Sequence, residues 1–163
     1  YINPIYVYGV EKFAKRAKAC GAAGVIVPDV PFEEKEEIRG SFEAEGLVVI
    51  SMVAPTSADR VRMIAKEAKG FLYCVSSLGV TGVRTEIGTA IGDLIQTVKE
   101  ECSIPCAIGF GISTPEQAEA MAKISDGAIV GSAIVKIVAK YGKSCVPYVK
   151  EYVQSMKQAV ERA

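Results

Sequence analysis

Short apolar runs alternate with amphipathic stretches along the chain. In the amphipathic stretches, hydrophobic positions recur at helical spacing, and Val10, Phe13, Ala14 and Ala17 form one such stripe. The apolar runs lack polar alternation, which is typical of parallel strands covered on both faces. This pattern predicts strands at 24–28, 47–53, 71–75, 104–110 and 127–132.

Start and stop signals place helices around these runs. Pro31 and the acidic residues after it suit the first turn of a helix, and Ser57 can cap another. Gly21 and Gly70 suit the position just after a helix. The expected helices span 10–21, 31–46, 57–70 and 113–124, and a further helix opens on Ser132.

The apolar runs recur at a nearly constant interval. They begin at 24, 47, 71, 104 and 127, so the spacings are 23, 24, 33 and 23 residues. A repeated β-loop-α unit of this length indicates right-handed crossovers in a parallel sheet. The long interval contains GVTGVRTEIG (79–88), which predicts an extended loop. The α/β repeat fits either a doubly wound sheet or a (β/α)8 barrel with about five βα units, in a single partial domain spanning 1–163.

Composition excludes several classes of function. Lys and Arg total 19, as do Asp and Glu, so no net basic field exists to attract nucleic acid. The absence of histidine removes the usual zinc sets, the Ser-His-Asp triad and any Cys-His nucleophile. Five irregularly spaced cysteines indicate reduced thiols in a cytoplasmic protein. No apolar run approaches the ~20 residues of a membrane-spanning helix.

Glycine-rich loops follow three consecutive predicted strands. They are SSLGVTG (76–82), GFGIS (109–113) and GSA (131–133). Glycine lets the backbone approach a ligand closely, and adjacent N–H groups can bind an oxyanion. A helix that starts there adds the positive end of its dipole. Because the carboxyl ends of parallel strands meet at one edge of the sheet, these loops predict a phosphate site there.

These loops, with PDVPFEE (28–34) and YINP (1–4), resemble the α subunit of tryptophan synthase over essentially the whole chain. The resemblance implies a (β/α)8 barrel that cleaves indole-3-glycerol phosphate to indole and glyceraldehyde 3-phosphate in tryptophan biosynthesis. It also implies a partner, the β subunit, which receives the indole. Pyridoxal phosphate is expected only in that partner, and no cofactor or metal is expected in this chain.

The resemblance assigns the phosphate site and a lid. Gly82, Gly111 and Ser132 would bind the substrate phosphate, with Gly131 beside them. Thr81 would lie on a mobile loop that closes over the substrate and would hydrogen-bond a catalytic aspartate.

The resemblance also assigns an indole pocket and a docking surface. Asn3 and the segment after it would lie against the β subunit. The residues that match the indole pocket are Tyr1, Ile26, Tyr73, Phe110 and Ile129.

The match to the family pattern begins partway along it. Tyr1 corresponds to the end of the family's third strand, so the units that carry the catalytic glutamate and aspartate would precede it. Nothing in 1–163 is an obvious replacement, and we expect this fragment to be inactive and to belong to a longer protein. Two alternatives stay open: a non-catalytic barrel fragment that binds phosphate or a partner, and another phosphate-binding barrel enzyme of amino-acid biosynthesis.

Several polar residues have competing interpretations. Asp29 is either a pocket or interface carboxylate or a cap for the helix that follows it. Glu86 and Asp93 fit a solvated loop or helix face better than a site. Ser76 and Ser77 lack a histidine partner, which argues against a nucleophilic serine.

Overall fold

The computed structural model describes residues 1–76, 84–109 and 111–163, with the backbone alone for 84–89. Each predicted apolar run contains at least one short strand, and every strand pairing is parallel. The strands are β1 (Gly24–Val25), β2 (Val48–Val49), β3 (Met52–Val53), β4 (Leu72–Val75), β5 (Cys106–Gly109) and β6 (Gly127–Ile129).

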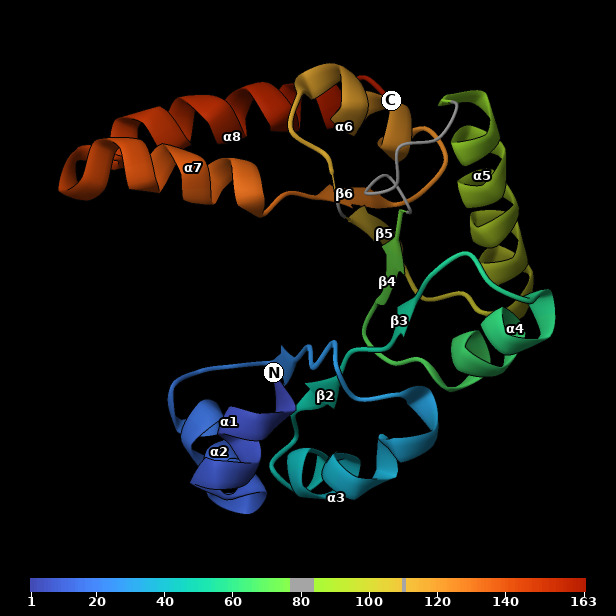
Figure 1. Cartoon of the computed structure of the whole chain (residues 1–163), viewed down its shortest axis with the longest axis vertical. Coiled ribbons are helices and arrows are strands. Elements are labelled where there is room, and N and C mark those ends of the chain that lie inside the picture. Colours follow the sequence, from blue (N-terminus) through green and yellow to red (C-terminus); the bar gives the residue numbers. More distant parts are fainter. Residues whose placement is uncertain (77–83, 110) are drawn as a thin grey trace.

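Helices alternate with the strands and lie on the outer side of the curved sheet (Figure 1). Among the described residues, no helix combines the length and the apolar character needed to cross a bilayer. The helices are α1 (Ile2–Tyr8), α2 (Val10–Ala19), the 3-10 helix η1 (Phe32–Glu34), α3 (Glu36–Ala44), α4 (Ala58–Glu67), α5 (Arg84–Glu101), α6 (Pro115–Ala122), α7 (Ser132–Tyr141), the 3-10 helix η2 (Gly142–Ser144) and α8 (Val146–Glu161).

The run 47–53 was expected to be one strand, and it forms two. β2 pairs with β1, whereas β3 pairs with β4. The change of partner occurs within two residues: the Ile50 N–H donates to the Val25 carbonyl (2.9 Å), and the Tyr73 N–H donates to the Ser51 carbonyl (3.0 Å). The five runs therefore follow one another as an open arc of five βα units (Figure 1). This confirms an α/β fold of incomplete-barrel type.

Two glycines end predicted helices as expected. Gly21 and Gly46 directly follow the C-caps of α2 and α3 and have φ of +84° and +67°, the left-handed region that favours glycine. Gly70 also has a positive φ (+74°), but α4 ends at Glu67 with Ala68 as an extended C-cap, so the predicted place of Gly70 just after the helix is wrong.

Ser57 occupies the N-cap of α4 but makes no side-chain cap hydrogen bond, so its predicted capping role is wrong. At the start of a different helix, α6, Thr114 forms a capping box with Gln117.

Two helical segments differ from the sequence predictions. α5 begins at Arg84, so the loop predicted for 79–88 ends earlier, and its first residues lie outside the described part of the chain. The segment after Tyr1 forms α1, and the Asp29 carboxylate accepts the Ile2 N–H (2.9 and 3.1 Å). Asp29 therefore caps α1 rather than the helix that follows it, because the turn after β1 brings its side chain to the N-terminus of α1.

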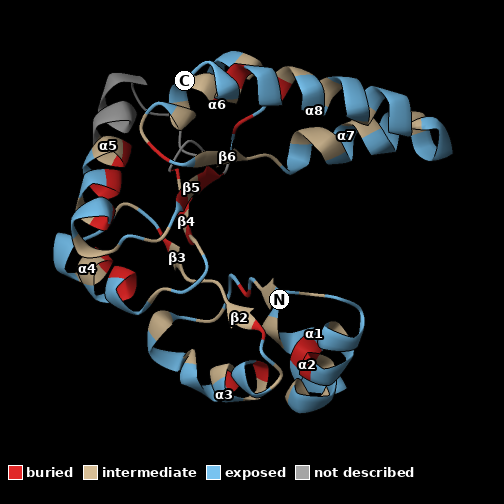
Figure 2. Cartoon of the chain, turned by 180° about the vertical axis from the view of Figure 1, so that it is seen from behind, coloured by how far each residue is buried: buried red, intermediate tan, exposed pale blue. Residues whose placement is uncertain are grey.

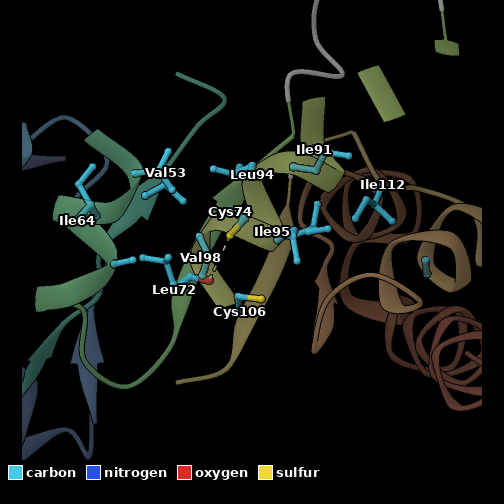
Figure 3. Close-up of a cluster of buried hydrophobic side chains, with 14 of the residues drawn as sticks. Val53, Ile64, Leu72, Cys74, Ile91, Leu94, Ile95, Val98, Cys106 and Ile112 are labelled. Carbon is cyan, nitrogen blue, oxygen red and sulfur yellow. Dashed lines mark hydrogen bonds between the residues drawn. The ribbon is translucent and has the colours of Figure 1, made fainter. Parts of the chain in front are cut away.

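Buried side chains form two clusters. The larger one packs the outward-facing residues of β3, β4 and β5 against α4, α5 and α6, as Figure 3 shows for Leu72, Cys74 and Ile95. The smaller one joins α1, α2 and α3 to β1 and centres on Phe42. Figure 2 shows this burial as red segments on the strands and on the inner sides of the helices. The helices thus cover one face of the sheet, and the other face lies inside the arc.

Asp126 ties β5 to β6 at the amino end of the sheet. Its carboxylate accepts the Cys106 N–H (2.8 Å), and its own N–H donates to the Cys106 carbonyl (2.9 Å). The hydrogen bond from the Cys106 backbone holds the pKa of Asp126 below its ordinary value. The ionised form of Asp126 therefore favours the folded state.

We expect Asp126→Asn to lower the free energy of unfolding by about 0.5–1 kcal/mol near pH 7, because a neutral acceptor bonds the Cys106 N–H more weakly. A depressed carboxyl pKa contributes stability above the unfolded-state pKa, and this contribution is lost as pH falls through the folded-state pKa. The difference between the two proteins in urea unfolding should therefore shrink below about pH 4. An equal difference at pH 3 and pH 7 would contradict this assignment.

Candidate functional site

Residues of four strands align in rows on the inner face of the sheet. Leu72 and Cys74 belong to the buried cluster under the helices, so the alternating residues of β4 face the other way. In one row, Met52 lies opposite Tyr73, Tyr73 opposite Ala107, and Ala107 opposite Gly127. In the next row, Val75, Gly109 and Ile129 lie side by side. These rows are apolar except for the Tyr73 hydroxyl.

Tyr73 lies directly against Gly109. A Cβ built on Gly109 would stand 2.5 Å from Cζ and 2.6 Å from Cε1 of the tyrosine ring, so only glycine leaves room for the ring there. Burial raises the pKa of the Tyr73 hydroxyl, which keeps it protonated near neutral pH. Gly109, the last residue of β5, thus leaves room for the Tyr73 ring on the inner face.

The loop after β5 is held in place by α6, by α8 and by the larger buried cluster. Gly111 is exposed and has a φ of +76°, while the next residue, Ile112, is buried in the larger cluster. Gln117 of α6 accepts the N–H groups of Ser113 (2.8 Å) and Thr114 (3.2 Å). From α8, the Tyr152 hydroxyl donates to the Ser113 carbonyl (2.9 Å). The position of Gly111 therefore depends on α6 and α8 as well as on β5.

The loop after β6 leads straight into the N-terminus of α7. Gly131 is the N-cap residue of α7 and has no side chain to cap the helix. Ser132 is the first helical residue. Both residues are exposed, and the first turn of α7 carries no acidic residue. Because β5 and β6 are neighbours, this positive helix end and the Gly111 loop emerge at the same edge of the sheet. Together they are suited to bind an anion.

The remaining predicted site residues lie elsewhere or outside the described residues. Tyr1 is 79% exposed and precedes α1, on which Asn3 is also exposed. Ile26 is 42% exposed and follows β1 of the two-stranded sheet, whereas Ile129 is in the four-stranded sheet. The predicted roles of Thr81, Gly82 and Phe110 fall on residues outside the described part of the chain.

Ser76 has a structural role at the end of β4. It is 2% exposed, and its hydroxyl and its N–H both donate to the Gly109 carbonyl at 3.0 Å. It thereby joins the carboxyl ends of β4 and β5 next to the site. Asp93 is exposed on α5, as expected for a solvated helix face.

Comparison with protein families assigns nearly the whole chain to one family. The family model described as tryptophan synthase alpha chain matches residues 1–161. The chain belongs to this family. The tryptophan synthase alpha family thus accounts for nearly every residue of the arc.

Individual members of the tryptophan synthase alpha family agree with this assignment. The alpha chain of Halalkalibacterium halodurans is 51% identical over 140 residues, covering 86% of this chain and 53% of that protein. The alpha chain of a Thermoanaerobacter species is 46% identical over 162 residues, covering 98% of this chain and 62% of the relative. The chain therefore spans between half and two thirds of the length of these relatives.

Solved structures show the same arrangement. Tryptophan synthase subunit alpha from Campylobacter jejuni superimposes with a TM-score of 0.87 at 33% identity, covering 96% of this chain and 62% of that one. The tryptophan synthase a2b2 complex from Pyrococcus furiosus contains a chain that matches with a TM-score of 0.82 at 31% identity, over 97% of this chain and 64% of its own. The open arc is thus part of the barrel of the tryptophan synthase alpha family.

One residue of the inner face was missed in the sequence analysis. Met52 lies opposite Tyr73 and extends the apolar row toward β2. Its place follows only from the register between β3 and β4, because the run 47–53 has no polar alternation that would show which residues face inward. Met52 is found to face inward because it pairs with Tyr73, whose side chain lies on the inner face.

Proposed function

We propose that this chain forms the phosphate- and indole-binding part of an enzyme that cleaves indole-3-glycerol phosphate to indole and glyceraldehyde 3-phosphate. The observation that carries the proposal is the juxtaposition of two surfaces at one edge of the sheet. The Gly111 loop and the N-terminus of α7 at Gly131 and Ser132 suit a phosphate. The neighbouring inner face, with Tyr73 and Ile129, suits an apolar ring system. A phosphorylated aromatic substrate combines both requirements.

The chemistry of this cleavage needs groups beyond the binding surface. It requires protonation of a ring carbon and removal of protons from the indole nitrogen and a glycerol hydroxyl. The aligned inner-face residues of β3 to β6 include no carboxylate. We therefore place the general acid and base outside residues 1–163. Proton transfers of this kind use no cofactor in this chain, and pyridoxal phosphate would belong to the partner.

A β subunit is the proposed partner. Support comes from the Pyrococcus furiosus relative, whose structure is an a2b2 complex. In this chain, α1 offers Asn3 and Val7, the latter 84% exposed, as a surface for such a partner. We also propose a cytoplasmic location, in which the free cysteines would remain reduced.

The test is calorimetric titration of the chain with indole-3-glycerol phosphate, together with an assay for released indole. We expect binding without turnover. If neither this ligand nor inorganic phosphate binds, the proposed site is wrong. If indole is released, the placement of the acid and base outside the chain is wrong. Binding of inorganic phosphate but not of the indole ligand would favour the alternative of a non-catalytic phosphate-binding module.

A further inference from the structure

A separate cavity lies on the helix side of the sheet, between the η1–α3 segment and α4. Its volume is about 290 Å³, and its apolar wall includes Phe32, Ile38, Val53 and Ile64. Val53 pairs with Cys74 in the outward-facing register, and η1, α3 and α4 supply much of the wall, although Met52 of the inner-face row also lines the cavity. The cavity is distinct from the site described above, because its lining does not include Tyr73, Gly111, Ile129 or Ser132.

The cavity exists because the strand run 47–53 changes its partner. β2 follows β1 only as far as Val49, and β3 then pairs with β4. The chain after β1 and the residues of β3 consequently diverge, and both Val27 and Val53 line the space between them. An ion pair connects α4 to η1, with Arg60 Nη2 3.1 Å from Glu33 Oε2.

The two charged residues that line the cavity are both cations. Lys35 and Arg60 line it, and none of the lining residues is a carboxylate. The Lys35 side chain is only 12% exposed, and its ammonium group lies 3.9 Å from the centre of the Phe32 ring. Its ion-pair partner, Glu67, is 2.9 Å away, is 49% exposed and does not line the cavity. Both lining cations are thus paired with carboxylates, Glu67 and Glu33, that do not themselves line the cavity.

We propose that this cavity binds a compact apolar monoanion, an aromatic or branched aliphatic carboxylate. A cavity of this volume is at the small end of ligand pockets and accommodates one or two rings. The apolar wall would take up the hydrocarbon body, and Lys35 and Arg60 would hold the carboxylate. Charge-assisted hydrogen bonds are strong in such partly desolvated surroundings. An anion bound there would link the β1 unit to the β3 unit without using any residue of the phosphate site.

The first experiment compares 1-naphthoate with 1-naphthylmethanol, which has the same ring system without the charge. In calorimetric titrations we expect the carboxylate to bind about tenfold more tightly than the alcohol. Lys35→Met should remove this preference. Lys66→Met is the matched control, because Lys66 is also on the outer side, pairs with Glu101 and does not line the cavity. It should leave the preference unchanged.

The second experiment requires no variant. In the unaltered chain, naphthoate should shift the backbone amide signals of Val27, Val53 and Ile64 rather than those of Gly111 and Ser132. Naphthoate should also bind the Gly111→Asp variant normally, so the outcome is independent of the phosphate site. The proposal is overturned if naphthoate does not bind, if the alcohol binds equally well, if Lys66→Met has the effect expected of Lys35→Met, or if the shifts centre on Gly111.

Discussion

A Gly111→Asp variant should bind indole-3-glycerol phosphate at least about a hundredfold more weakly than the unaltered chain, a loss of about 2.7 kcal/mol. Gly111 is exposed at the edge of the sheet where the N-terminus of α7 emerges. A carboxylate at this position would repel the phosphate at close range and would compete for the same N–H groups. Calorimetric titration measures the change directly.

The variant should still fold, and this makes the test specific. Gly111 has a φ of +76°, and Asp is one of the few residues with a side chain that adopt this region. Gly21→Asp is a matched control, because Gly21 has a φ of +84°, is exposed and has open space around the position of a Cβ. Equal weakening in both variants would show that the loss comes from backbone strain or net charge, and the site assignment would fail.

Phe42→Ala should lower the free energy of unfolding by about 3–5 kcal/mol. Phe42 is fully buried and packs edge-on against Phe13, with ring centroids 6.1 Å apart. The cluster around it contains only six buried residues, so few neighbours can move in to fill the cavity left by the ring. Urea unfolding followed by circular dichroism provides the measurement.

Val7→Ala serves as the control for this effect. Val7 is on α1, next to the same cluster, but its side chain is 84% exposed. Its truncation should change stability by less than about 0.5 kcal/mol. If Phe42→Ala costs less than about 1 kcal/mol, the smaller cluster does not contribute to the stability of the fold as described.

Much of the fold was predictable from local sequence signals. The apolar runs predicted all five strand-bearing segments, because strands covered by helices are continuously apolar and the runs recur at a βα spacing. Gly21 marked a helix end correctly because a left-handed residue is a local requirement, whereas Gly70 lies beyond the extended C-cap of α4. α8 was missed, and no helix was predicted for α1, which follows the single residue Tyr1 that was taken for the end of a strand.

Predictions that depend on distant contacts were less successful. Ser57 has the right residue type and place for a cap but makes no cap hydrogen bond. Asp29 was interpreted either as a pocket or interface carboxylate or as a cap for the helix that follows it, yet its carboxylate accepts the N–H of Ile2 at the start of α1, 27 residues away in sequence. Whether a side chain hydrogen-bonds a local or a distant partner is decided only when the chain packs. No local sequence pattern shows which partner it will have.

By itself, the sequence determined the order of the βα units, the glycine loops after the strands and the family to which the chain belongs. These features depend on residue type and spacing along the chain, and both can be counted before folding. The tertiary structure decided the rest: Met52 beside Tyr73, the Tyr73 ring over Gly109, and the cavity lined by Lys35 and Arg60. Each of these results from the register between neighbouring strands and from the change of partner within residues 47–53. Register and pairing depend on which strands come together, so they arise only when segments distant in sequence pack against one another.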